Sequence, residues 1–223
     1  MLERITPKQF LESDGVADWR IVGSDGACAF FPTASFAESV RFVRGIGDLA
    51  GVEDHRPRVD IRRDGVTVSL ISIDPGYMGM SRQDADLARQ ISVVARQLGL
   101  SAIPTAVQSL LVVPGATDIK TIMPFWRAAL GYEPRIDSPD EDLVDPHDRL
   151  AAFWFEQMKE PRGDGGGAIH LAVWVAYEEA EARVAAALAA GGHMVRDEFA
   201  PRWWTLADAM GNEVDIATIS GRA

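Results

Sequence analysis

The sequence changes its hydrophobic pattern at Ser101–Thr105, and this change constrains the fold more than any other feature. A predicted helix ends at Gly99 just before this segment, and Pro104 restricts the backbone that precedes it. Before the segment, the pattern predicts the order helix, two strands, helix, two strands, helix. After it, a strand–helix–strands unit occurs twice, about 60 residues apart. We therefore expect two domains, residues 1–100 and 105–223, both of the α+β class.

Composition excludes several kinds of partner. The 223 residues carry a formal net charge of −11, and such a surface repels nucleic acid and anionic membranes. Cys28 is the only cysteine, so no intrachain disulfide can form. No apolar run approaches the roughly 20 residues that span a bilayer. We expect a soluble cytoplasmic protein that binds a small molecule and forms a homodimer or larger homo-oligomer through its sheet edges.

Capping residues and a tight turn mark the elements of the first half. Thr6-Pro7-Lys-Gln9 offers an N-cap hydroxyl, a proline at the first helical position and a capping-box glutamine. Ser81, with Asp84 completing its cap, begins the last helix of this half. An Asp-Gly turn joins Val59–Ile61 to a strand expected over Val66–Ile73. These signals predict an antiparallel sheet with helices on one face.

His55 lies in a charged turn, Glu53-Asp-His-Arg-Pro57, just before the strands of this sheet. An imidazole at a sheet edge can take and give a proton near neutral pH. A histidine in a charged turn is also commonly a solvated surface residue. The residues alone leave both interpretations open.

Several segments of the first half match one known family. They are Trp19, Phe30-Phe31, Glu53-Asp-His-Arg-Pro57 and Gly79-Met-Ser-Arg-Gln-Asp84. On these segments, roughly residues 1 to 100 resemble the pterin-4a-carbinolamine dehydratases, which carry Glu-Lys-His-His-Pro and Gly-Leu-Ser/Thr-x-x-Asp at the last two places. The resemblance implies a dehydratase-like antiparallel sheet. It also implies a hydro-lyase that dehydrates 4a-hydroxytetrahydropterin, with histidines as acid and base and with no required cofactor.

The resemblance assigns roles to particular residues. His55 is the first histidine of the family motif, and Arg56 stands in place of the second. The third falls on Ile73 or on the segment Asp74-Pro-Gly-Tyr77, which is two residues longer than usual. The implied catalytic residues are His55, Glu53 and Asp74, and the implied pterin contacts are Arg56 and Pro57.

The second half matches another group of proteins. Its matching segments are Asp118 followed by Phe125-Trp-Arg-Ala-Ala-Leu-Gly-Tyr132, Ile169-His-Leu-Ala-Val-Trp-Val175, and Leu206-Ala-Asp-Ala-Met-Gly-Asn-Glu-Val214. On these segments the second half resembles the vicinal-oxygen-chelate superfamily, in particular its glyoxalase-like and bleomycin-resistance-like members. The resemblance implies paired βαβββ modules that form a half-open barrel.

Metal-using members of that superfamily place one ligand on each of four strands. The corresponding positions here are Leu111, Glu156, His170 and Asp215. Leucine cannot bind a metal, so Glu156, His170 and Asp215 form a three-ligand candidate site for a divalent ion. Because the fourth donor is absent, we expect this site to be mostly metal-free as purified. We expect it to hold an organic ligand instead, with His170 and Asp215 as hydrogen-bonding groups and Trp204 at its mouth.

Two hypotheses about function follow. The first is a 4a-hydroxytetrahydrobiopterin dehydratase-like hydro-lyase, fused to a glyoxalase-like domain. The second is a non-catalytic small-molecule binding protein of the bleomycin-resistance or glyoxalase-like type, since Arg56 and Leu111 replace functional groups of both families. Turnover at either site would favour the first hypothesis, and tight binding without turnover would favour the second.

Overall fold

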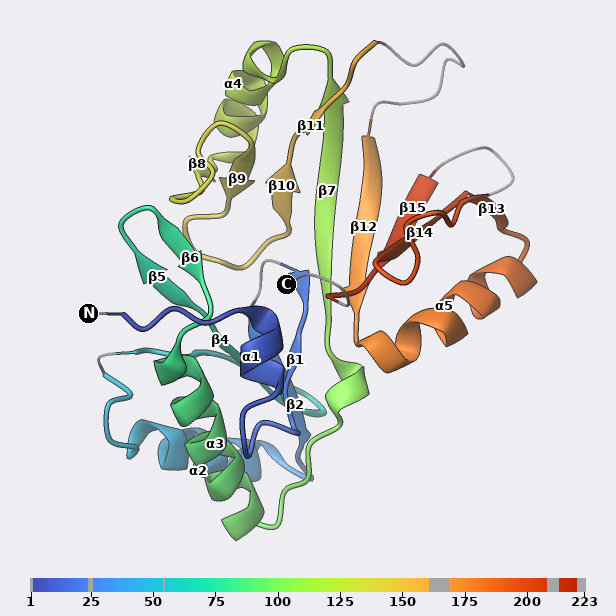
Figure 1. The fold of residues 1–223 in the computed structure, drawn as a ribbon. Coiled ribbons are helices and arrows are strands. Elements are labelled where there is room, and N and C mark those ends of the chain that lie inside the picture. Colours follow the sequence, from blue (N-terminus) through green and yellow to red (C-terminus); the bar gives the residue numbers. More distant parts are fainter. Residues whose placement is uncertain (1, 24–25, 54, 161–168, 208–212, 220–223) are drawn as a thin grey trace. The chain divides into compact units, whose positions relative to one another are not determined.

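The computed structural model describes residues 2–23, 26–53, 55–160, 169–207 and 213–219 (Figure 1). The chain separates into two compact units, one ending at Val107 and the other beginning at Gln108. Each unit is described by itself, as the N-terminal unit and the C-terminal unit. No helix in these ranges is both long and apolar enough to cross a bilayer.

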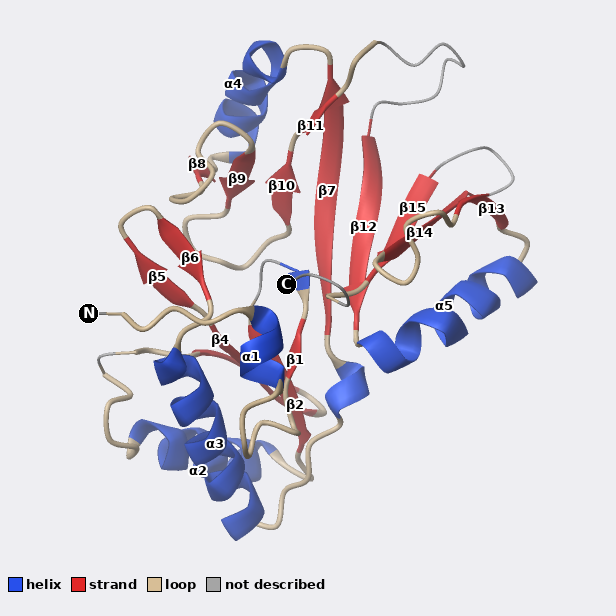
Figure 2. Ribbon diagram, in the orientation of Figure 1, coloured by secondary structure: helices blue, strands red, loops and turns tan. Residues whose placement is uncertain are grey.

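The N-terminal unit combines three helices with a small antiparallel sheet and a separate hairpin (Figure 2). In chain order its elements are α1 (Pro7–Leu11), β1 (Arg20–Ile21), β2 (Ala27–Pro32), α2 (Phe36–Gly47), β3 (Arg58–Arg62), β4 (Gly65–Leu70), β5 (Ser72–Asp74), β6 (Tyr77–Gly79), α3 (Arg82–Gln97) and a 3-10 turn (Pro104–Ala106).

The helix starts follow the capping residues of the sequence. Thr6 and Gln9 form a reciprocal capping box at α1. Ser81 and Asp84 form a second box at α3. Such boxes satisfy backbone N–H groups that the first helical turn leaves without partners. The predicted starts of both helices are therefore confirmed.

The main sheet of this unit has the strand order β1-β2-β4-β3, and all its neighbouring strands are antiparallel. Phe31 of β2 meets Phe42 of α2 edge to face, with ring centroids 4.9 Å apart. Both rings are fully buried, so their contact packs α2 against the sheet. This arrangement confirms the α+β class of the first half.

The hairpin β5–β6 differs from the sequence-based expectation of one strand over Val66–Ile73. β4 ends at Leu70, and Ser72–Asp74 pairs instead with Tyr77–Gly79. Gly76 supplies the positive φ of +68° that the tight turn requires. The expected single strand is therefore divided between β4 and β5. The turn at Gly76 reverses the chain, so β5 pairs with β6 and does not continue β4.

The C-terminal unit contains two strand–helix–strand modules. Its elements are β7 (Gln108–Ala116), α4 (Ile119–Leu130), β8 (Glu133–Pro134), β9 (Asp142–Val144), β10 (Ala152–Trp154), β11 (Glu156–Gln157), β12 (Ile169–Val175), α5 (Tyr177–Ala189), β13 (His193–Arg196), β14 (Trp203–Ala207) and β15 (Glu213–Ala217).

One mixed sheet joins the two modules, in the order β13-β14-β15-β12-β7-β10-β9-β8, with β11 beside β7. The first strands of the modules, β7 and β12, pair antiparallel at the centre. β10 of the first module lies parallel to β7, and β15 of the second module lies parallel to β12. The predicted pair of βαβββ modules is confirmed by this topology.

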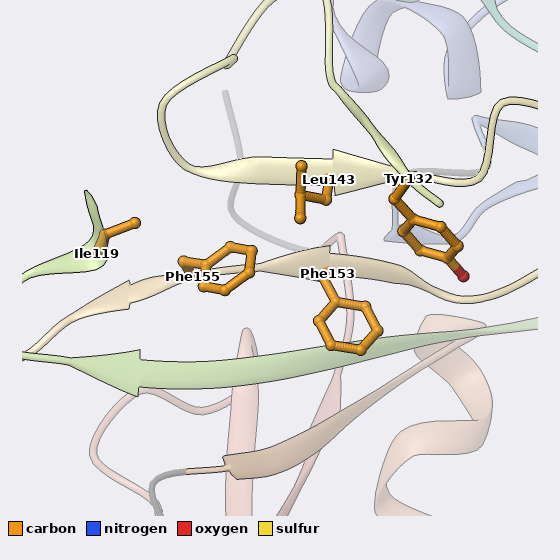
Figure 3. Close-up of a cluster of buried hydrophobic side chains, with 5 residues drawn as sticks. All are labelled: Ile119, Tyr132, Leu143, Phe153 and Phe155. Carbon is orange, nitrogen blue, oxygen red and sulfur yellow. The ribbon is translucent and has the colours of Figure 1, made fainter. Parts of the chain in front are cut away.

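Two apolar clusters lie between the sheet and its helices. Figure 3 shows the first, built from five buried side chains in or next to α4, β9 and β10: Ile119, Tyr132, Leu143, Phe153 and Phe155. The second lies under α5 and contains Val175, Ala180, Val184, Leu206 and Ile216. Because side chains alternate along a strand, the residues between these positions belong to the opposite face of the sheet.

Candidate functional site

His55 lies between α2 and β3 of the N-terminal unit. Its Nε2 is 2.5 Å from Oδ1 of Asp84, in the first turn of α3. The Asp84 side chain is fully buried, whereas the His55 side chain is 15% exposed. The imidazole is thus open to a small molecule on one side and bound to a buried carboxylate on the other.

Serine side chains hold the Asp84 carboxylate in one orientation. Its Oδ2 accepts hydrogen bonds from the Ser81 amide at 2.6 Å, from Ser81 Oγ at 2.8 Å and from Ser72 Oγ at 2.8 Å. Ser72, Ser81 and Asp84 are all buried. The positive end of the α3 dipole also favours a negative group at this position. Oδ1 is therefore fixed as the acceptor for His55.

This arrangement suits proton transfer. A carboxylate bound to one imidazole nitrogen orients the ring and leaves the other nitrogen to face a ligand. His55 Nδ1 forms no hydrogen bond with any residue in the described ranges. That nitrogen can therefore exchange a proton with a ligand, as general acid or general base.

The other residues implied for this site are bonded elsewhere or exposed in the described ranges. Glu53 and Arg56 form an exposed ion pair of 3.3 Å, with side chains 82% and 80% exposed. Asp74 is exposed at the β5–β6 turn. Within the described ranges, no hydrogen bond or ion pair joins these three residues to His55. Pro57 is half-buried directly before β3, and Asp54 lies outside the described residues.

A second polar group lies in the C-terminal unit. His170 Nε2 is 3.3 Å from Asp215 Oδ2, and Thr205 Oγ1 donates to Asp215 Oδ1 at 2.6 Å. Strand register places these residues on one face, because Asp215 is opposite both Ala172 and Thr205. This is the face that the helices leave uncovered. His170 and Asp215 are thus brought together as the sequence predicts.

Glu156 does not complete a metal site with this pair. It lies exposed on β11, opposite Gly115 of β7, whereas His170 on β12 is opposite Val113 of the same strand. Within the described ranges, no three His, Cys, Asp or Glu side chains gather closely enough to hold a metal ion. The His170 and Asp215 atoms that would bind the ion are instead hydrogen-bonded to each other and to Thr205. The expected three-ligand set is therefore not assembled.

Trp204 requires a correction. It was expected beside His170 and Asp215, but it packs against the apolar cluster under α5. Trp204 is opposite Ile216, whereas the adjacent Thr205 is opposite Asp215. Since neighbouring residues point to opposite faces of a strand, Trp204 belongs to the helix-covered face and contributes to the core.

The titration of His170 gives a testable property of this pair. Burial lowers the pKa of His170, but the hydrogen bond and charge of Asp215, with the charges of Glu156 and Glu213, raise it by more. The net pKa lies above its usual value of 6.5. Because folding raises this pKa, the pair stabilises the unit fully below pH 6.5. The stabilisation is lost as the pH rises through the folded-state pKa.

We therefore expect Asp215→Asn to lower the free energy of unfolding, and to lower it most at acid pH. The difference between the two proteins should shrink as the pH rises above 6.5 and through the pKa of His170 in the folded protein. Urea unfolding followed by circular dichroism, repeated across this range, measures the difference. A difference that stays constant with pH would contradict the coupling of His170 to Asp215.

Comparison with known proteins gives two separate matches. Residues 3–94 match the family model described as pterin 4 alpha carbinolamine dehydratase. A candidate pterin-4-alpha-carbinolamine dehydratase from Rhodopseudomonas palustris (strain HaA2) is 31% identical over 103 residues, which are 45% of this chain and 100% of the relative. The chain belongs to the pterin-4a-carbinolamine dehydratase family. A candidate dehydratase from Roseiflexus sp. (strain RS-1) is 39% identical over 64 residues, or 29% of this chain and 67% of the relative.

The second match lies after the dehydratase-family unit: residues 111–217 match the family model described as glyoxalase-like domain. A solved structure from Vibrio splendidus 12B01 is described as a member of the glyoxalase/bleomycin resistance protein/dioxygenase superfamily. It is 16% identical with a TM-score of 0.34, and the match covers 50% of this chain and 99% of that one.

Asp84 is the site residue that sequence reasoning missed in the dehydratase-family unit. The sequence presented it as the end of a capping box, and it does cap α3. Its second carboxylate oxygen is the one that meets His55. The sequence did contain a signal for a functional role: Asp84 ends the segment Gly79-Met-Ser-Arg-Gln-Asp84, which matches a motif of the dehydratase family.

Proposed function

We propose that the N-terminal unit dehydrates a 4a-hydroxytetrahydropterin, with His55 as its proton carrier. The observation that carries this proposal is the 2.5 Å contact between His55 and the fully buried Asp84. Membership of the dehydratase family supports the reaction class. Glu53, Arg56 and Asp74, implied as parts of the site, lie outside the pair that we assign to the chemistry.

The reaction needs one proton delivered and one removed. Protonated His55 gives its Nδ1 proton to the hydroxyl oxygen on C4a of the pterin. The C4a–O bond breaks, water leaves, and the lone pair of N5 forms a C4a=N5 double bond. Neutral His55 then takes the proton from N5. The substrate loses one water, and His55 returns to its starting state.

One histidine can serve both steps because they occur in sequence. Asp84 holds the imidazole ring in one orientation during both steps. Ser72 and Ser81 keep the carboxylate in place throughout, since both donate to its other oxygen. This accounts for catalysis without a histidine at Arg56 or Ile73.

Stopped-flow absorbance tests the proposal with the full chain and a synthetic 4a-hydroxytetrahydropterin. We expect the protein to accelerate dehydration well above the spontaneous rate in the same buffer. Arg56→Ala should retain the wild-type rate, because the Arg56 side chain is 80% exposed and pairs with Glu53. Saturable pterin binding without acceleration would reject the proposal in favour of a binding protein.

A further inference from the structure

We propose that the segment Glu3–Ile5, here called the N-terminal segment, positions the His55–Asp84 pair. It does so by holding Met80–Arg82, the part of the chain that leads into α3. The proposal rests on the proposed dehydration, because it assigns a role in orienting the same pair. The N-terminal segment acts through Ser81, so its residues are positioning residues and not catalytic ones.

Two backbone hydrogen bonds join the N-terminal segment to the chain between β6 and α3 (Figure 1). The Ile5 amide donates to the Met80 carbonyl oxygen at 3.0 Å, and the Arg82 amide donates to the Glu3 carbonyl oxygen at 2.9 Å. One bond runs in each direction, as in an antiparallel ladder. The Ile5 side chain is buried, so the segment is also anchored in the core of the unit.

The same contacts fix the residue that holds Asp84. Ser81 lies between the two bonded residues and forms an antiparallel bridge with Arg4. Ser81 donates to Asp84 Oδ2 through its amide at 2.6 Å and through its hydroxyl at 2.8 Å. Oδ1 of the same carboxylate meets His55. A displacement of Ser81 therefore turns the carboxylate and changes the orientation of the imidazole.

Tyr77 of β6 strengthens this arrangement. Its hydroxyl donates at 2.6 Å to the Met80 carbonyl oxygen, which also accepts from Ile5. The Arg4 guanidinium lies over the Tyr77 ring, 4.1 Å from its centroid, in a cation–π contact. Gly79 leaves room for the ring, since a Cβ atom there would lie 2.8 Å from Tyr77 Oη. The β5–β6 hairpin and the N-terminal segment therefore hold Met80 together.

A proline at position 82 removes one of these backbone bonds selectively. Arg82 is the first residue of α3, where proline is well tolerated, and Ser81 has the extended backbone that suits a following proline. Arg82→Pro therefore loses the N–H that donates to Glu3 and keeps the helix start. The matched control is Arg82→Ala, which loses the same side chain and its exposed ion pair with Glu3 but keeps the N–H.

Stopped-flow absorbance with 4a-hydroxytetrahydropterin measures the effect on the reaction. We expect kcat of Arg82→Pro to be about fivefold below that of Arg82→Ala, the effect of one lost hydrogen bond. KM should not change, because the fully buried Asp84 does not reach the substrate. Tyr77→Phe loses its bond to Met80 and keeps its ring beneath Arg4, so it should lower kcat by about twofold, again at constant KM.

NMR of the imidazole separates this proposal from the proposed function, because it requires no turnover. The ¹H and ¹⁵N signals of the His55 ring are identified by their absence from His55→Gln. They should shift in Arg82→Pro and keep their wild-type positions in Arg82→Ala. If wild type does not accelerate dehydration but these shifts occur, the proposed function fails and the positioning role stands.

Two results would overturn the positioning role. The first is an Arg82→Pro protein in which the His55 signals are unchanged, or in which kcat equals that of an active Arg82→Ala. The second is a Tyr77→Phe protein with wild-type kcat and wild-type His55 signals, which decides the matter if circular dichroism shows that Arg82→Pro does not fold.

Discussion

His55→Gln is expected to lower kcat for dehydration of 4a-hydroxytetrahydropterin by about 10²–10⁴-fold. Glutamine can still hydrogen-bond to Asp84, but its amide cannot carry a proton at neutral pH. The loss should therefore fall on kcat, with little change in KM. Stopped-flow absorbance under saturating substrate measures kcat directly.

The matched control is His193→Gln, which makes the same change at an exposed position of β13. Its kcat should equal that of wild type. Circular dichroism of both variants checks that the fold is intact. If His55→Gln keeps its rate while retaining the fold, the assignment of His55 as proton carrier is wrong.

Trp19→Ala should destabilise the N-terminal unit by about 3–5 kcal/mol, the cost of emptying a large buried site. The Trp19 side chain is fully buried, and its Nε1 donates to Ser92 Oγ of α3 at 3.1 Å. The substitution removes both the packing of the indole and this hydrogen bond. Hydrogen exchange measured by mass spectrometry should show faster exchange in peptides from β1 and α3.

Ser92→Ala separates the two contributions of Trp19. It leaves the indole packed but removes its acceptor, so we expect a smaller loss of about 1–3 kcal/mol. If Trp19→Ala costs less than about 1 kcal/mol, which is typical of surface substitutions, the tryptophan is not the core anchor of this unit.

Local signals made much of the fold predictable. The capping boxes at Thr6 and Ser81 depend on residues three positions apart, so the sequence alone reveals them. Asp118 and Gly131 likewise mark the two ends of α4, and Gly131 has the positive φ of +69° expected at a helix end. The repeated strand–helix–strands order predicted the two modules of the C-terminal unit.

Features set by tertiary contacts were not predictable in this way. His55 and Asp84 are 29 residues apart in sequence, and only the folded chain shows that they touch. The break between β4 and β5 depends on pairing with β6. Trp204 was assigned to the wrong face of the sheet. Strand register determines that Thr205, and not Trp204, is opposite Asp215, and a single sequence does not reveal this register.

The two roles of Asp84 have a consequence for tracing this activity through related chains. Its carboxylate begins α3 through Ser81 and also meets His55, so selection for a stable helix alone is enough to preserve it. We expect relatives that have lost dehydration to keep an aspartate here and to change first at position 55. The histidine, whose removal leaves the helix start intact, is therefore the better marker of retained chemistry.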